Sequence, residues 1–133
     1  MLKVSCGGKI PEGEVRGNCR DLLALAQALR TRNSVLVCAT TGSAYPYDRL
    51  LGKIVVRWLR EEVPRVTVVE NSGELEIRGD PARLSTMADN IEALARGGVG
   101  GEHWHVEHIP GEPYVAAGSY PIAISLEIER VGT

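Results

Sequence analysis

The chain contains no phenylalanine, and aromatic residues make up only 5% of its 133 positions. No apolar run approaches the ~18 residues of a membrane-spanning helix. The first six residues are typical of a strand rather than a signal peptide, so we expect a cytoplasmic protein without a membrane segment. Hydrophobic residues nevertheless make up 44% of the chain, which excludes intrinsic disorder and predicts a single domain over residues 1–133.

Cysteines and cofactor motifs are also scarce. Cys6, Cys19 and Cys38 are odd in number and widely spaced, and no CxxC pair is present to bind zinc or carry out redox chemistry. We expect them to be small buried side chains. The glycine-containing segments 42–46 and 97–101 match neither a phosphate-binding loop nor a dinucleotide fingerprint. We therefore expect no cofactor.

Charge is distributed unevenly along the chain. Residues 1–65 carry 11 basic and 6 acidic side chains, a net charge of +5, whereas residues 66–133 carry 4 and 11, a net charge of −7. This asymmetry indicates electrostatic attraction to a partner or between the two halves. The basic residues are expected on helix faces without aromatic platforms, which disfavours nucleic acid as the partner.

A short segment recurs in the sequence. Glu14-Val15-Arg16-Gly17-Asn18 returns sixty-two residues later as Glu76-Ile77-Arg78-Gly79-Asp80. Each copy precedes a helical pattern, for which Asn18 and Asp80 are suitable N-caps and Pro81 a suitable first residue. We therefore predict two divergent ββαβ-type repeats, over about residues 1–65 and 66–133.

The hydrophobic patterns predict the individual elements and the fold class. Strands are predicted over residues 2–6, 14–16, 34–40, 66–71, 74–78, 102–109 and 120–130, with a helix after Asn18 and another after Asp80. The apolar spacing over residues 48–63 predicts a third helix with a basic outer face, although Gly52 keeps a strand as the alternative. The expected fold is α+β, with a mostly antiparallel sheet and helices packed on one face.

All three histidines lie in one short segment, residues 102–108. On a strand, His103, His105 and Glu107 project from the same face, because side chains alternate with period two. Two imidazoles and a carboxylate form a candidate zinc or iron site. The alternative is a solvated outer face opposite a core face that includes Trp104.

The second half resembles a known family over Gly73 to Leu126. The segments that carry the resemblance are Glu74–Pro81, the following amphipathic helix, His103–Glu107 and Ala117–Ile122. Together they resemble immunity-protein family 32 of bacterial polymorphic toxin systems. The resemblance implies a small cytoplasmic α+β protein that binds and neutralises a cognate toxin without catalysis.

Strand alternation predicts where such a partner binds. We expect the core to contain Leu75, Ile77, Trp104, Val106, Ile124, Leu126 and Ile128. The residues predicted to share the opposite, acidic face are Glu74, Glu76, His103, His105, Glu107, Glu127 and Glu129. A basic protein is the expected partner, with Tyr114 or Tyr120 as an aromatic anchor. The alternative is that these glutamates only keep the face soluble.

Two other functions remain open at this point. One is a metal-dependent enzyme or metal sensor that uses His103, His105 and Glu107. The other is a structural or oligomeric subunit, with Trp58 and the basic helix predicted from Arg49 to Arg60 at an interface between identical chains.

Overall fold

The computed structural model describes residues 1–9, 11–112 and 114–128, and these residues form two α-helices and nine strands. The strands are β1 (Lys3–Cys6), β2 (Gly13–Gly17), β3 (Val35–Val37), β4 (Arg49–Leu51), β5 (Lys53–Trp58), β6 (Arg65–Val69), β7 (Glu74–Gly79), β8 (His103–Val106) and β9 (Ile122–Leu126). The helices are α1 (Cys19–Leu29) and α2 (Pro81–Gly97), and a short 3-10 helix, η1 (Glu70–Ser72), joins β6 to β7.

The strands form two sheets. Sheet A has the order β4-β1-β2-β9-β8, and sheet B has the order β3-β5-β7-β6. The predicted α+β class is confirmed, but the single shared sheet is wrong. Both sheets are mixed, because β2 pairs with β9 in parallel and β5 pairs with β7 in parallel, whereas the other five pairings are antiparallel.

Both predicted helix starts are confirmed. The Asn18 side chain accepts a hydrogen bond from the Asp21 amide, and the Asp21 side chain accepts one from the Asn18 amide, so α1 begins with a reciprocal capping box. At α2, the Asp80 side chain accepts from the Arg83 amide, and Pro81 is the first helical residue. No helix in the described part of the chain is both long and apolar enough to cross a membrane.

The helix predicted over residues 48–63 is wrong, and the alternative strand is found there. β4 and β5 occupy the segment, and Gly52 lies between them. The Gly52 amide donates to the Gly73 carbonyl at 3.0 Å, and its carbonyl accepts from the Cys38 amide at 2.8 Å. Since β5 lies between β3 and β7, its backbone groups are paired on both sides, and these distant partners override the local helical spacing.

The two hairpins pair equivalent residues when one is shifted by sixty-two positions, which is the spacing of the sequence repeat. In the β1–β2 hairpin Val4 lies opposite Val15, and in the β6–β7 hairpin Val66 lies opposite Ile77. Each hairpin is extended by a strand from the other half of the chain, since β9 joins β2 and β5 joins β7. The internal repeat stays a prediction, and these registers support it.

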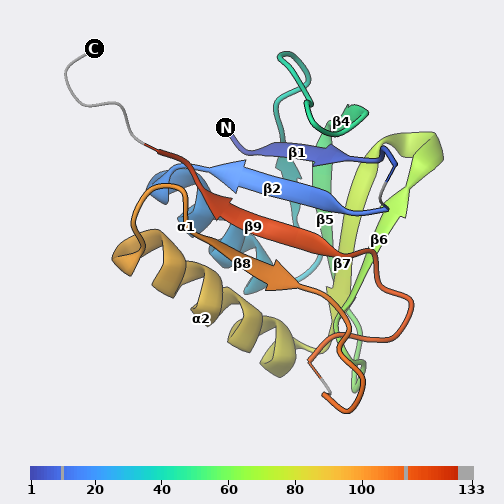
Figure 1. Cartoon of the computed structure of the whole chain (residues 1–133). Coiled ribbons are helices and arrows are strands. Elements are labelled where there is room, and N and C mark those ends of the chain that lie inside the picture. Colours follow the sequence, from blue (N-terminus) through green and yellow to red (C-terminus); the bar gives the residue numbers. More distant parts are fainter. Residues whose placement is uncertain (10, 113, 129–133) are drawn as a thin grey trace.

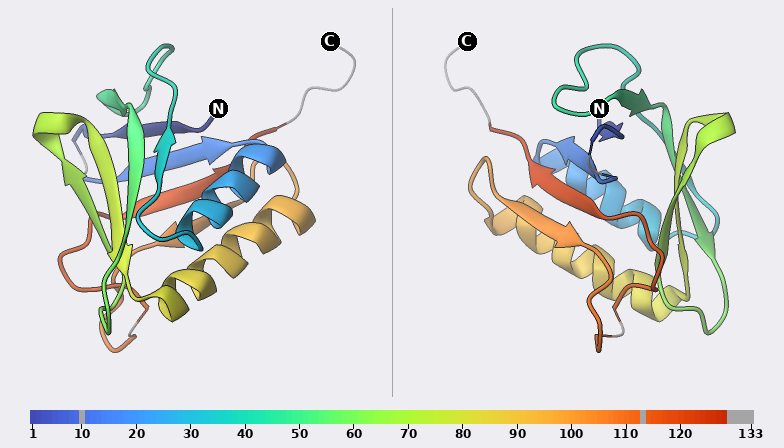
Figure 2. Two further views of the ribbon diagram at one scale, coloured as in Figure 1. Left: turned by 180° about the vertical axis from the view of Figure 1, so that it is seen from behind. Right: turned by 45° about the vertical axis from the view of Figure 1, so that its right-hand side comes forward.

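One core joins both sheets to both helices. Figure 1 views sheet A from its outer face, and Figure 2 shows the two helices on the opposite side of that sheet, with sheet B beside them. The largest fully buried side chains come from both sheets and both helices, and they include Val4, Val15, Leu22, Leu25, Ile54, Ile77, Leu84, Ile91 and Ile124. The hydrophobic core is therefore shared by the two halves of the chain.

The cysteines belong to this core to different degrees. Cys6 and Cys38 are buried as expected, whereas Cys19, at the start of α1, is only partly buried. Burial raises the pKa of the Cys38 thiol to about 11. A thiol with so high a pKa stays protonated at neutral pH, which agrees with a packing role for Cys38.

Two expected core positions differ in the structure. Ile128 is 68% exposed beyond the end of β9, and Trp104 is only half-buried because β8 is an edge strand. The apolar run predicted as a strand over residues 34–40 forms only the short β3, where Val35 and Val37 face solvent. These differences arise at sheet edges, where a strand has a neighbour on one side only.

Candidate partner-binding surface

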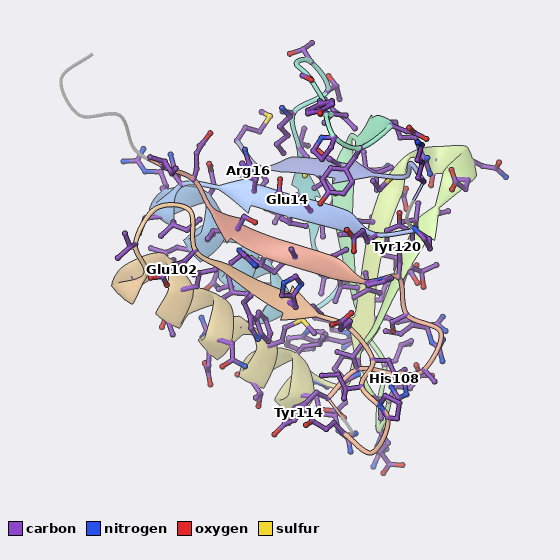
Figure 3. All side chains as sticks on the ribbon, viewed as in Figure 1. Glu14, Arg16, Glu102, His108, Tyr114 and Tyr120 are labelled. Carbon is purple, nitrogen blue, oxygen red and sulfur yellow. The ribbon has the colours of Figure 1, made fainter. Side chains whose placement is uncertain are left out.

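The outer face of sheet A carries two rows of side chains across its strands. The pairing register places Lys3, Arg16, Ser125 and His103 in one row, and Leu50, Ser5, Glu14, Ala123 and His105 in the next. Both helices lie on the other side of this sheet, and Figure 3 shows Glu14 and Arg16 on the face toward the viewer. Ser5 and Ser125 are buried within these rows, whereas Arg16, His103 and His105 are exposed.

Charge on this face is divided between its two ends, which corrects the prediction of a uniformly acidic surface. Glu14 accepts hydrogen bonds from the Ser125 hydroxyl at 2.9 Å and from the Arg16 guanidinium at 3.2 Å. Lys3 lies opposite Arg16 and adds positive charge at that end. At the other end, Glu12 and Glu107 line a hollow of about 60 Å³.

Tyr47 lines the same hollow, and the nearby carboxylates change the pKa of its phenol. The pKa of Tyr47 is raised, first by burial of the phenol and then by the negative charges of Glu14 and Glu12. The same direction is expected for any acidic group near carboxylates, because ionisation would add a like charge. The acidic end of the face is thus defined by Glu12 and Glu107.

Glu74 and Glu76 do not lie on this face. They belong to β7 in sheet B, where Glu74 contacts the Lys53 ammonium at 3.1 Å and Glu76 contacts the Arg57 guanidinium at 3.1 Å. The prediction that they lie on one face with His103 and His105 is therefore wrong, because β7 and β8 belong to different sheets. Glu127 is exposed just beyond β9, and Glu129 lies outside the described residues.

The predicted metal cluster does not come together. The rings of His103 and His105 meet edge to face, with centroids 4.8 Å apart. Among the described residues, no three His, Cys, Asp or Glu side chains are arranged to hold a metal ion. Glu107 and His105 both line the hollow that also contains Glu12 and Tyr47. The two imidazoles remain exposed on the outer face of an edge strand.

A groove runs beside β8, on the side that faces α2. It has a volume of about 410 Å³, and its walls include Thr86 and Asn90 from α2, Trp104 from β8, and Tyr114 and Val115 from the following loop. A smaller hollow of about 210 Å³ shares these five residues. Glu107 and Glu112 also line the larger groove, so an apolar floor is bordered by carboxylates.

The loop that closes this groove is held by its own contacts. A ring nitrogen of His108 lies 2.9 Å from the Val115 carbonyl oxygen, and the Val115 side chain is buried. Tyr114, the next residue back along the chain, is 66% exposed. Figure 3 shows Tyr114 near one end of β8 and Glu102 near the other. Tyr114 therefore suits the predicted role of an aromatic anchor.

Tyr120 and Trp58 have internal partners. The Tyr120 hydroxyl accepts from the Gly7 amide at 3.0 Å and donates to the Glu12 carbonyl at 2.9 Å, and burial raises its pKa. The Trp58 indole donates to the Leu29 carbonyl at 3.1 Å. Because residues 53–58 form β5, the basic helix that would place Trp58 at an interface between identical chains is absent from the described structure.

The sequence placed His105, Glu107 and Tyr114 at the partner-binding surface and assigned Trp104 to the core, but the other walls of the groove were missed. Thr86 and Asn90 are four residues apart on α2, so the helical period places them on one face. Nothing local, however, indicates that this face lies beside β8. Glu112 and Val115 belong to an irregular loop, where no period applies.

The chain is thus a small α+β protein with a groove beside the edge strand β8. Residues 74–130 match the family model of immunity protein 32. No curated protein and no solved structure gives a significant match to the chain. The matched segment begins at β7 and runs through α2, β8 and β9, so it contains every residue that lines the groove.

Proposed function

We propose that this protein is an immunity protein that neutralises a cognate toxin by binding to it, with no catalytic step of its own. The observation that carries the proposal is the match of residues 74–130 to immunity protein 32. The groove beside β8 adds support, because its lining lies wholly within the matched segment.

The chemistry of the surface suits protein recognition. Binding energy at protein interfaces is concentrated in a few aromatic and arginine side chains in pockets, surrounded by a polar rim. Trp104 and Tyr114 supply the aromatic groups, and Glu107 and Glu112 supply an acidic rim. A stable complex buries about 1,200 Å² or more in total. The groove and the adjoining outer face of sheet A provide a continuous surface for such an interface, since His105 and Glu107 border both.

The acidic rim also favours a basic toxin. Complementary charge accelerates association, and this acceleration declines as salt screens the charges. Lys3 and Arg16 lie at the opposite end of the outer face, so the orientation of a basic partner is set by charge as well as by shape. The expected complex therefore forms fastest at low ionic strength.

Co-expression with the product of the neighbouring gene tests the proposal. We expect that product to arrest bacterial growth when expressed alone, and growth to recover when this chain is expressed with it. The two proteins should also elute together from a sizing column. Toxicity that persists beside folded, abundant chain, or a harmless neighbouring product with no affinity for the chain, would contradict the proposal. A variant with a disrupted core, Ile77→Asp, is the control for rescue that requires the folded protein.

A further inference from the structure

The outer edge of β8 is open. Sheet A ends at β8, and no other strand of the described residues pairs with its outer edge. The Leu126 amide donates to the Glu102 carbonyl at 2.9 Å, so the backbone carbonyl of Glu102 points toward β9. In an antiparallel pair successive residues face alternate sides, and the backbone groups of His103 and His105 therefore point away from β9. They are free to bind another strand.

A strand added at this edge would meet two different environments. Neighbouring strands lie about 4.8 Å apart, and their side chains alternate between the two faces of the sheet. One set would project on the outer face beside His105 and Glu107. The other set would project over the groove between Trp104 and α2, which is lined by Tyr114 and Val115.

The charges on this edge favour a basic occupant. No salt bridge to Glu12, Glu107 or Glu112 forms among the described residues. Arg83 lines the adjoining hollow, but its guanidinium is already paired with Asp80 at 2.6 Å. A second copy of β8 would bring no lysine or arginine to these carboxylates, because residues 102–109 contain neither.

We propose that an extended segment of the partner, in which basic and apolar residues alternate, pairs with β8 as a sixth strand of sheet A. Its arginine or lysine side chains lie beside Glu107 on the outer face, and its apolar side chains enter the groove against Trp104 and Tyr114. Main-chain hydrogen bonds to His103 and His105 supply affinity, and the alternating pockets supply specificity. In taking the toxin as the source of this segment, the inference rests on the proposed function.

A synthetic peptide tests the docking site independently of any toxin. The probe is a short, capped peptide that alternates arginine and valine, and the control alternates glutamate and valine. We expect the arginine peptide to shift the amide NMR signals of His103 and His105 and the indole signal of Trp104 in a saturable manner. The glutamate peptide should leave them unchanged. Equal effects of both peptides, or shifts only at β3, would overturn the inference.

Two variants at one position test the backbone pairing. His105→Pro removes the amide donor that faces away from β9, whereas His105→Ala keeps it. We expect the proline variant to lose peptide binding by at least about tenfold and the alanine variant to retain it. Unfolding temperatures of both variants identify any loss that is due to misfolding. Equal binding by the two folded variants would exclude strand pairing.

Charge reversal with the toxin separates this inference from the proposed function. Glu107→Lys with Glu112→Lys should slow association at low salt by about tenfold. Glu61→Lys with Glu62→Lys makes the same charge change at exposed positions between β5 and β6 and should have little effect. If the toxin binds the wild type and neither the first pair nor His105→Pro alters binding, the inference is wrong and the proposed function stands. If the arginine peptide binds β8 but no toxin is bound, the proposed function fails and the docking site remains.

A second copy of the chain is the remaining occupant to test. Sedimentation of the protein alone over a range of concentrations should show a monomer, which leaves the edge of β8 open. A dimer that His105→Pro abolishes and His105→Ala preserves would place a second copy on β8 and overturn the inference.

Discussion

β8 and β3 are edge strands in corresponding positions of the two sheets, but they expose different chemistry. β8 pairs with β9, which joins β2 in parallel, and β3 pairs with β5, which joins β7 in parallel. The outer side chains of β8 are histidines, followed by Glu107, whereas those of β3 are Val35 and Val37, 57% and 70% exposed. The same topological position thus supports a polar edge in one sheet and an apolar edge in the other.

The inner sides of these edges differ as well. Leu36 of β3 and Trp104 of β8 are both packed against the core, but Trp104 also borders an open groove. An edge alone offers only backbone hydrogen bonds, which any extended chain can use. A groove and carboxylates beside the edge add selectivity. The comparison indicates that β8 is suited to recognition, while the short length of β3 limits unwanted pairing.

The largest expected effect comes from the strands next to these edges. Ile54 and Ile122 are buried, and each lies opposite a residue of an edge strand, Leu36 in β3 and Val106 in β8. Ile54→Ala and Ile122→Ala should each lower the free energy of unfolding by about 3 kcal/mol, because each leaves a cavity. Urea denaturation measures both. A loss below about 1 kcal/mol for only one of them would show that the two positions are not equivalent.

The next largest effect concerns the groove. Tyr114→Ala should weaken toxin binding by about 2 kcal/mol, because an exposed aromatic anchor beside Trp104 would be lost. Tyr45, which is 88% exposed in another loop, provides the matched control Tyr45→Ala. Calorimetric titration of the toxin with each variant makes the comparison. Equal toxin affinities of the two variants would show that Tyr114 does not contribute to the interface.

The two helix caps differ in their response to pH. Hydrogen bonding from the Arg83 amide lowers the pKa of Asp80, whereas the Asn18 cap does not titrate. Because the folded-state pKa is lowered, the stability from charged Asp80 is fully present above its unfolded pKa of about 4 and is lost as the pH falls through the folded value. Asn18→Ala should cost about 1 kcal/mol.

Thermal unfolding of Asp80→Asn at neutral and acidic pH tests this difference. The difference in unfolding temperature between wild type and Asp80→Asn should narrow as the pH falls below about 4. The gap between wild type and Asn18→Ala should stay nearly constant. A gap that widens in acid for Asp80→Asn would show that the charged cap does not stabilise the fold.

The smallest expected effect is at β3. Val35→Lys and Val37→Lys should change the free energy of unfolding by less than about 0.5 kcal/mol, because both side chains already face solvent. Toxin binding should also be unchanged, whereas self-association at high protein concentration should decrease. Denaturation, binding and light-scattering measurements test these outcomes. Weaker toxin binding by these variants would show that the interface includes sheet B.

Much of the local structure could be predicted from sequence because its causes are local. The caps at Asn18 and Asp80 lie next to the helices that they start, and the alternation in β7 and β9 reflects which side chains are buried. β8 pairs with β9, as a single acidic face shared by residues 103–107 and 127–129 requires. The candidate site was predicted only in part. His105, Glu107 and Tyr114 were placed in it, but Thr86, Asn90 and Glu112 were not.

The sequence by itself determined the helix starts, the hairpins and the faces of most strands, since capping and side-chain period act over a few residues. Only the tertiary structure decided that residues 53–58 form a strand and that Glu76 and His105 belong to different sheets. It also decided that α2 forms one wall of a groove beside Trp104. Each of these outcomes depends on pairing or packing between segments far apart in the chain, and a ladder of such contacts outweighs a local preference.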